Sequence, residues 1–365
     1  MLNLFCLIVF CTLIAMCLEK KSKNYGNVYR ALIKADFTCW ALISILFISF
    51  ILFSGLRTTY NDTFVYIETF QVVDGDMLSI DMLLNPYGGF EFLMYFIKKY
   101  VSIDYRFFLL TTSIIINVIY LWFISKHSKK FSISIICYFI FGDYLFTMAG
   151  VKQALAMSLS LIGIDALIRD KKSVFILFII IASLFHPYIV CLLVIPFFTK
   201  EKIGAKTLLI IGCMVIALMN LDVLIGMARL IGKDYTIDEM ITHTINPIRV
   251  VVEFIPIFYL MVGKKKLDKE NNDLFNLGIN MMLVNYVLIF MGLFFSPIYF
   301  SRIGTYFSVI NIITIPHMLN VLYRKHKNKV INLLLYYAVF TIYFFLDVTK
   351  LGSISIFTDL FNHVL

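Results

Sequence analysis

Long apolar stretches alternate with short polar segments along almost the whole chain. A helix needs about 20 mainly apolar residues to cross a bilayer, and backbone exposed to lipid must satisfy its own hydrogen bonds. The pattern therefore predicts helical spans rather than strands. We place twelve of them, at residues 2–18, 36–54, 107–124, 131–146, 151–168, 173–185, 187–198, 207–224, 250–262, 274–295, 303–322 and 330–346. The expected fold is an all-α polytopic membrane protein, with residues 1–365 forming a single transmembrane domain.

The composition agrees with this fold class. The chain is 61% hydrophobic and 15% charged, whereas soluble domains average roughly 45–50% apolar and about 25% charged residues. The seven cysteines lie in or beside apolar stretches and form no CxxC pair, so neither a disulfide framework nor a zinc site is predicted. The first stretch, 2–18, has no basic residue before it and is expected to be a retained helix rather than a cleaved signal.

Most of the 32 lysines and arginines gather in six segments between the predicted spans. These segments are 20–34, 126–130, 169–172, 200–206, 264–269 and 324–329. The positive-inside rule places them in the cytoplasm, so the net charge of +9 reflects loop charge and no nucleic-acid partner is expected. Two long segments then face outward. One is 55–106, with a short amphipathic helix near 89–100, and the other is 225–249.

One part of this topology depends on a proline. Residues 173–198 are long enough for a single helix, but that reading would move the later lysine clusters to the outside. Proline disfavours helix at the residue before it, so a break at His186-Pro187 is expected. We therefore predict two short spans joined by a turn, with His186 near the outer face.

Several cations stand at the outer ends of spans, against the orientation bias. Arg57, Lys152, Arg249 and Arg302 each begin or follow a predicted span there. A lipid diphosphate at that depth would account for them, because arginine and lysine donors match phosphate oxygens. A headgroup anchor is the alternative for Arg57. Arg249 and Glu253 are four residues apart, which favours an internal ion pair.

Other polar residues are expected close to these cations. Asp62 and Tyr66 are four residues apart on one helix face, although Asp62 could instead cap that helix. Glu91 is the one acid in an apolar outer segment, which is costly unless the carboxylate is paired or functional. His186 is interpreted as a base, a diphosphate ligand or a satisfied buried histidine. Arg302 and Tyr306 also share one helix face.

The order of these residues resembles a known family. The motifs are R-x4-D-x3-Y from Arg57, GFE ending at Glu91, GVKQ at 150–153, LFHPY around His186 and R-x3-Y from Arg302. The sequence is similar to the EpsG-like branch of the Wzy polysaccharide polymerases, which serve bacterial capsule, exopolysaccharide and O-antigen pathways. The family usually has arginine where this chain has Lys152. Lysine keeps the charge but loses bidentate phosphate recognition, which leaves the role of this position open.

The resemblance implies a glycosyltransferase at the outer face of the bacterial plasma membrane. It would move a glycan from one polyprenyl-diphosphate-linked oligosaccharide to another and release polyprenyl diphosphate. The fold would be similar to that of the lipid-dependent multi-spanning (GT-C-like) glycosyltransferases. Membrane lipids, a chain-length regulator and a flippase of the same pathway are the implied partners. No metal or other cofactor is implied, and Asp74-Gly75-Asp76 is interpreted as an ordinary loop.

In that reaction, each candidate residue has an expected role. The cations would bind the diphosphate, a carboxylate or histidine would take the acceptor proton, and the remaining side chains would orient sugar. The diphosphate ligands are Arg57, Lys152 and Arg302; the candidate bases are Glu91, His186 and Asp62; the orienting residues are Tyr66, Gln153 and Tyr306. Asp62 would alternatively hold Arg57 in place.

Two other functions fit a chain of this kind. A lipid-linked oligosaccharide flippase needs charged residues along a cavity reachable from both faces. Here the candidate residues gather on the outer side, and the spans below them are largely apolar. A membrane O-acyltransferase of surface glycans would need an inward route for its donor and an Arg/His constellation near the first helices, which this sequence does not have.

Overall fold

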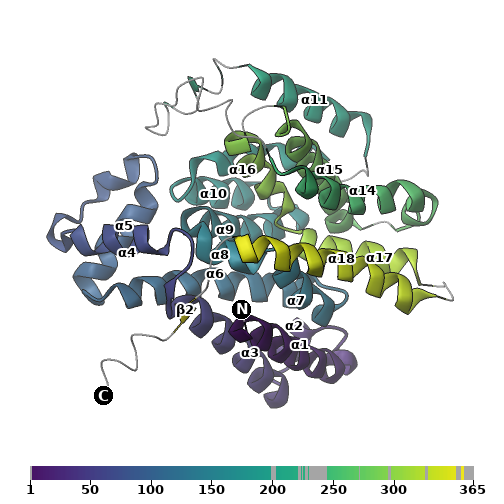
Figure 1. Ribbon diagram of the computed structural model, residues 1–365, viewed down its shortest axis with the longest axis horizontal. Helices are drawn as coiled ribbons and strands as arrows, with labels where there is room; N and C mark the ends of the chain where they lie inside the picture. The colour runs from purple at the N-terminus through teal and green to yellow at the C-terminus, as the bar shows by residue number, and fades with distance from the viewer. Residues whose placement is uncertain are drawn as a thin grey trace.

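The computed structural model describes residues 2–198, 203–220, 223, 225, 226, 229, 245–270, 272–294, 297–324, 328–350 and 355–356. Figure 1 shows that this part of the chain is a bundle of helices. The elements are α1 (Leu2–Ser22), η1 (Lys23–Tyr25), α2 (Val28–Ile33), α3 (Phe37–Gly55), β1 (Arg57–Thr59), α4 (Thr63–Val72), η2 (Gly75–Met77), η3 (Ile80–Leu84), α5 (Gly88–Tyr100), α6 (Tyr105–His127), α7 (Phe131–Ile140), α8 (Asp143–Ala149), α9 (Val151–Ile168), α10 (Lys172–Ser183), η4 (Pro187–Phe198), α11 (Ala205–Met219), α14 (Pro247–Leu267), α15 (Asp273–Met291), α16 (Pro297–Ser308), α17 (Asn311–Leu322), α18 (Lys329–Lys350) and β2 (Ser355–Ile356). The strands β1 and β2 pair antiparallel.

Among the described residues, six helices are long and apolar enough to cross a membrane. These are α1, α3, α6, α9, α15 and α18. Two bent pairs, α7 with α8 at 46° and α16 with α17 at 60°, raise the number to eight if each pair is one span. The all-α membrane class is confirmed, but the predicted twelve spans are not. The helices α10, η4 and α11 are apolar but shorter than a full span. The predicted outer segment 225–249 lies largely outside the described residues.

Polar caps fix where several helices begin. The Asp36 carboxylate accepts a hydrogen bond from the Cys39 N–H, 2.9 Å away, at the start of α3. Asp104 does the same for Arg106 at the start of α6, and Asn272 for Phe275 at the start of α15. Each cap satisfies an N–H that the helix itself leaves without a partner.

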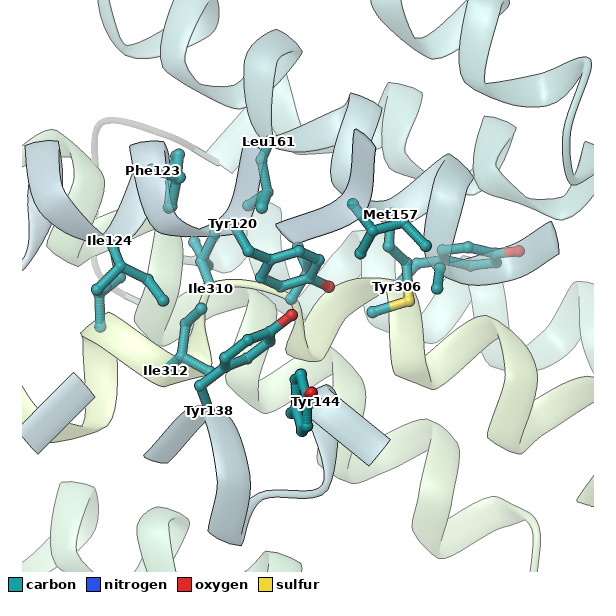
Figure 2. Packing of buried hydrophobic residues seen from close by; sticks show 14 of the residues in the cluster. Tyr120, Phe123, Ile124, Tyr138, Tyr144, Met157, Leu161, Tyr306, Ile310 and Ile312 are labelled. Carbon is teal, nitrogen blue, oxygen red and sulfur yellow. The ribbon is translucent and has the colours of Figure 1, made fainter. Parts of the chain in front are cut away.

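The span α9 forms the centre of the bundle. Its window is 78% buried, whereas the windows of α1 and α18 are 22% and 17% buried. It packs against α6, α8, α10 and η4. Figure 2 shows Met157 and Leu161 of α9 in one packed layer with Tyr120 and Tyr138. The outer helices expose large apolar side chains such as Trp40, as lipid-facing helices do.

The predicted break at His186-Pro187 is confirmed. The helix α10 ends at Ser183 and η4 begins at Pro187, and the two elements pack against each other. Proline lacks the N–H that would continue the helix, and it pushes the preceding residue out of helical geometry. Residues 173–198 are therefore not one helix, and the turn between the two elements presents Leu184, Phe185 and His186.

Candidate functional site

The amino-terminal end of α9 is the point where most of the candidate residues meet. It follows α8 after Gly150, where an added Cβ would lie 2.9 Å from the Phe146 ring. A larger residue would push the two helices apart. The next two positions, Lys152 and Gln153, make contacts with two different parts of the chain.

The ammonium group of Lys152 lies over two aromatic rings. Its Nζ is 4.9 Å from the ring centroid of Tyr87 and 5.0 Å from that of Phe90. A cation is attracted to the negative face of such a ring. Tyr87 has φ +62°, a left-handed conformation that is uncommon for a bulky residue. The strained turn before α5 therefore places the two rings against the start of α9.

The same turn is held against the break after α10. The Gly89 N–H donates to the Leu184 carbonyl at 2.9 Å. An added Cβ at Gly89 would lie 2.8 Å from the Leu184 side chain and 3.1 Å from its backbone. The glycine of the GFE motif thus permits a close approach of two backbones. As a result, the rings of Tyr87 and His186 meet edge to face at 5.4 Å.

His186 is also joined to α16. Its Nδ1 is 2.5 Å from the Tyr306 hydroxyl, and the side chains are 5% and 0% exposed. The ring of Tyr188 packs on His186 at 5.5 Å. A hydrogen bond between two buried groups fixes the orientation of the imidazole.

The Gln153 side chain contacts the backbone of Arg302, not its guanidinium group. The Gln153 Nε2 donates to the Arg302 carbonyl at 3.0 Å, and the Gln153 side chain is buried. The Arg302 side chain is exposed at the same end of the bundle. Gln153 therefore positions α16 against α9, and Arg302 presents its guanidinium outward.

Arg57 does not reach the surface where the sequence places it. It is 2% exposed, and its three nitrogens donate to Thr63 Oγ1 at 2.9 Å, the Ser54 carbonyl and the Met148 carbonyl at 3.3 Å. All three acceptors are neutral. Burial lowers the pKa of Arg57 from its usual value to about 10, so the group stays protonated at neutral pH. Arg57 therefore connects α3, α4 and the end of α8, and each of its three nitrogens already has a protein acceptor.

Tyr66 and Asp62 take different positions, although they lie on one short helix. The Tyr66 ring packs on Phe90 at 5.8 Å, and its hydroxyl lies against the backbone N–H groups of Val151 and Lys152. Burial raises the pKa of Tyr66 to about 12. Asp62 is exposed and does not cap α4. No ion pair joins it to Arg57, whose acceptors are all neutral, so it does not hold that residue in place.

Glu91 lies in the first turn of α5, next to Phe90, and is half-buried. Within the described residues, no side chain forms an ion pair or hydrogen bond with its carboxylate. Among the described residues, Glu91 is therefore not paired with an arginine. The carboxylate is available to a ligand.

The ion pair expected between Arg249 and Glu253 is wrong. Arg249 Nη1 donates to Ser301 Oγ at 3.0 Å, and Glu253 accepts from Asn285 at 3.2 Å. Each charged group has found a neutral partner on a neighbouring helix. The first contact ties α14 to α16 beside Arg302, so it supports the same end of the bundle.

The sequence alone does not point to Tyr87. It stands in NPYGGFE, where the proline and glycines indicate a turn but give no role to the aromatic residue between them. Only the folded chain brings it between Lys152 and His186. By contrast, Asp74 accepts from the Asp76 N–H at 3.1 Å, which is ordinary loop capping.

Comparison with known proteins gives one result. A search of curated proteins finds no match, and neither does a search of solved structures. The model of the EpsG family matches residues 40–359, which include every candidate residue discussed above. This match covers well over half of the chain and points to a polymerase-type role in polysaccharide biosynthesis. The chain therefore belongs to the EpsG family.

Proposed function

We propose that this protein joins polyprenyl-diphosphate-linked oligosaccharide repeat units at the outer face of the bacterial plasma membrane. The observation that carries the proposal is the meeting of Lys152, His186, Tyr306 and Arg302 around the start of α9, with Glu91 on the adjoining helix. Cations, a carboxylate and aromatic rings are the groups that a diphosphate and a sugar require.

The reaction breaks one bond and forms another. A hydroxyl oxygen of the acceptor glycan attacks the anomeric carbon of the donor, while the bond from that carbon to the diphosphate oxygen breaks. Polyprenyl diphosphate leaves with the electron pair. In our proposal Lys152 and Arg302 stabilise the charge that develops on it. Arg57 is assigned a positioning role through its contacts with α3, α4 and α8, in place of the diphosphate-ligand role expected from the sequence.

The acceptor proton passes to Glu91 in this proposal. No described side chain forms a hydrogen bond or ion pair with its carboxylate, whereas the Nδ1 of His186 is engaged by Tyr306. A base must be able to reach the proton that it takes. In this proposal His186 and Tyr306 form one rigid side of the site, and Tyr66 and Tyr87 hold the neighbouring side chains in position. We assign Asp62, which is exposed at the start of α4, to contact with the glycan rather than with the reacting atoms.

The packing along α9 favours an enzyme over a flippase. A second charged cluster does lie on this helix, at Asp165, so the spans below the candidate site are not uniformly apolar. Between Lys152 and Asp165, however, Met157 and Leu161 are buried and belong to the packed apolar cluster shown in Figure 2. An O-acyltransferase has no observation in its favour.

The test uses purified protein in proteoliposomes with a synthetic lipid-linked repeat unit. We expect glycans of two or more units together with free polyprenyl diphosphate. The Glu91→Gln variant is expected to lose this activity, and Glu68→Gln, which alters an exposed acid on α4, is the matched control. Movement of the lipid across the bilayer without chain extension would replace the proposal with the flippase alternative.

A further inference from the structure

A pocket of about 410 Å³ opens at the other end of α9. Asp165, in its wall, is thirteen residues beyond Lys152, which corresponds to roughly 20 Å along a helix. Five basic side chains line the pocket: Lys126, His127, Lys129, Arg169 and His317. None of them has a part in the polymerisation proposed above, and the volume is in the usual range for a ligand site.

The basic side chains are arranged around one buried carboxylate. Asp165 is 0% exposed and lies 2.7 Å from Lys126 Nζ and 2.8 Å from His127 Nε2, with a further contact to Arg169. A buried carboxylate that is held in this way fixes the positions of its partners. Its single negative charge offsets only one of the permanent charges of Lys126 and Arg169.

The remaining charge of the pocket is also positive. Lys129 adds a third permanent cation, and Asp273 is the one further acid in the lining. Three cations therefore face two carboxylates, before either histidine takes up a proton. Glu270, an acid outside the lining, accepts the Nε2 proton of His317 at 3.2 Å. A pocket whose lining holds more permanent cations than carboxylates is suited to an anion.

The surroundings of Lys126 indicate how deep the pocket lies. Its Nζ is 5.0 Å from the Trp122 ring centroid and 5.5 Å from that of Tyr29. Tryptophan and tyrosine are enriched at the level of the lipid headgroups. The pocket also adjoins segments 126–130 and 169–172, two of the basic clusters that the positive-inside rule assigns to the cytoplasm.

We propose that this pocket binds a phosphate group, that of an anionic phospholipid headgroup at the cytoplasmic surface of the membrane. Basic pockets between transmembrane helices on that side are suited to anionic lipid headgroups. A soluble phosphorylated compound would offer the same phosphate group. The experiment below distinguishes binding of such a compound from binding of the lipid.

The experiment measures binding of phosphatidylglycerol and phosphatidylcholine to the purified full-length protein by native mass spectrometry. We expect preferential retention of phosphatidylglycerol. The Lys129→Ala variant should weaken this retention about fivefold, since a basic residue near an anionic lipid surface contributes about 1 kcal/mol. Among the described residues, Lys129 forms no ion pair that the substitution would break. The matched control is Lys130→Ala, which removes the same charge one residue away, at a side chain 4.0 Å from Glu19 and outside the pocket.

A second variant is expected to strengthen the retention of phosphatidylglycerol instead of weakening it. Asp165→Asn removes the internal anion and leaves Lys126 and Arg169 without their carboxylate, so it should be less stable but bind phosphatidylglycerol more tightly. Stabilisation of this variant by inorganic phosphate, with no preference for phosphatidylglycerol, would support the phosphate site and assign it to a soluble ligand. Equal losses in Lys129→Ala and Lys130→Ala, or no response to either lipid or phosphate, would overturn the proposal.

Discussion

The Tyr306 hydroxyl and the His186 Nδ1 are 2.5 Å apart and join two parts of the chain that are 120 residues apart in sequence. This bond connects α16 to the break between α10 and η4. The same break receives the Gly89 N–H from α5, and α16 is bound to α9 through Gln153. One end of the bundle is therefore held by three contacts between elements that are distant in the sequence.

Tyr306→Phe tests the first of these contacts. The variant keeps the ring but leaves the His186 Nδ1 without its partner, and a buried polar group without a partner costs about 1–3 kcal/mol. We expect a lower melting temperature and a clear fall in polymerisation. Tyr336→Phe is the matched control, because the buried Tyr336 hydroxyl has no hydrogen-bond partner in the part of the chain that is described. If the two variants unfold at the same temperature, the bond contributes nothing to stability.

Gly89→Ala tests the approach of α5 to the break. The added methyl group would lie within 2.8 Å of Leu184, and overpacking of this kind costs about 1–3 kcal/mol. To relieve this contact α5 would have to move, and Tyr87 would move away from His186 and Lys152. We therefore expect a loss of activity larger than the loss of stability alone would cause. The control is Gly212→Ala in α11, where nothing lies within 4 Å of the added carbon. That variant should be neutral or slightly more stable, since alanine favours helix. Full activity in Gly89→Ala would show that the site tolerates movement of α5.

Hydropathy predicts the long spans well because a lipid-exposed backbone has few alternatives to a helix. The bends are harder to predict. The predicted span 131–146 is interrupted at Gly142, which has φ +84° and starts a second helix at an angle. The local cue was present in the Gly-Asp pair, but apolar residues on both sides concealed it.

Some residues of the candidate site could be predicted from the sequence, and others could not. The charged residues at span ends could be found from their conflict with the positive-inside rule. The burial of Arg57 could not, because one of its acceptors, the Met148 carbonyl, is 91 residues away in sequence. The role of Tyr87 could not be found either, because its left-handed backbone and the close approaches at Gly88 and Gly89 exist only in the folded chain.

Lys152→Arg and Lys152→Gln separate charge from geometry. The Lys152 cation lies over the rings of Tyr87 and Phe90, and arginine can stack on the same rings while offering two donors to a phosphate. We expect Lys152→Arg to retain activity and Lys152→Gln to lose about a hundredfold in turnover, as with loss of one transition-state donor. Lys99→Gln, which removes an exposed cation near Asp76, should leave turnover unchanged. Equal activity of the glutamine variant and the wild type would remove Lys152 from the mechanism.

Arg57→Lys tests whether Arg57 acts through structure, and its effect should depend on pH. Lysine cannot reach all three acceptors, so the variant should lose about 1.5–3 kcal/mol from charged hydrogen bonds. A buried ammonium without an acidic partner has its pKa depressed below the unfolded value of about 10.4. Between the folded and unfolded pKa values the unfolded state binds more protons, so stability rises with pH. The wild type stays charged in both states up to a pH of about 10. Thermal unfolding at pH 6.5 and pH 9.5 should therefore show a smaller deficit of Arg57→Lys at the higher pH. A deficit that is the same at both values would mean that the substituted ammonium reaches solvent, and that the enclosure of Arg57 is not maintained in the variant.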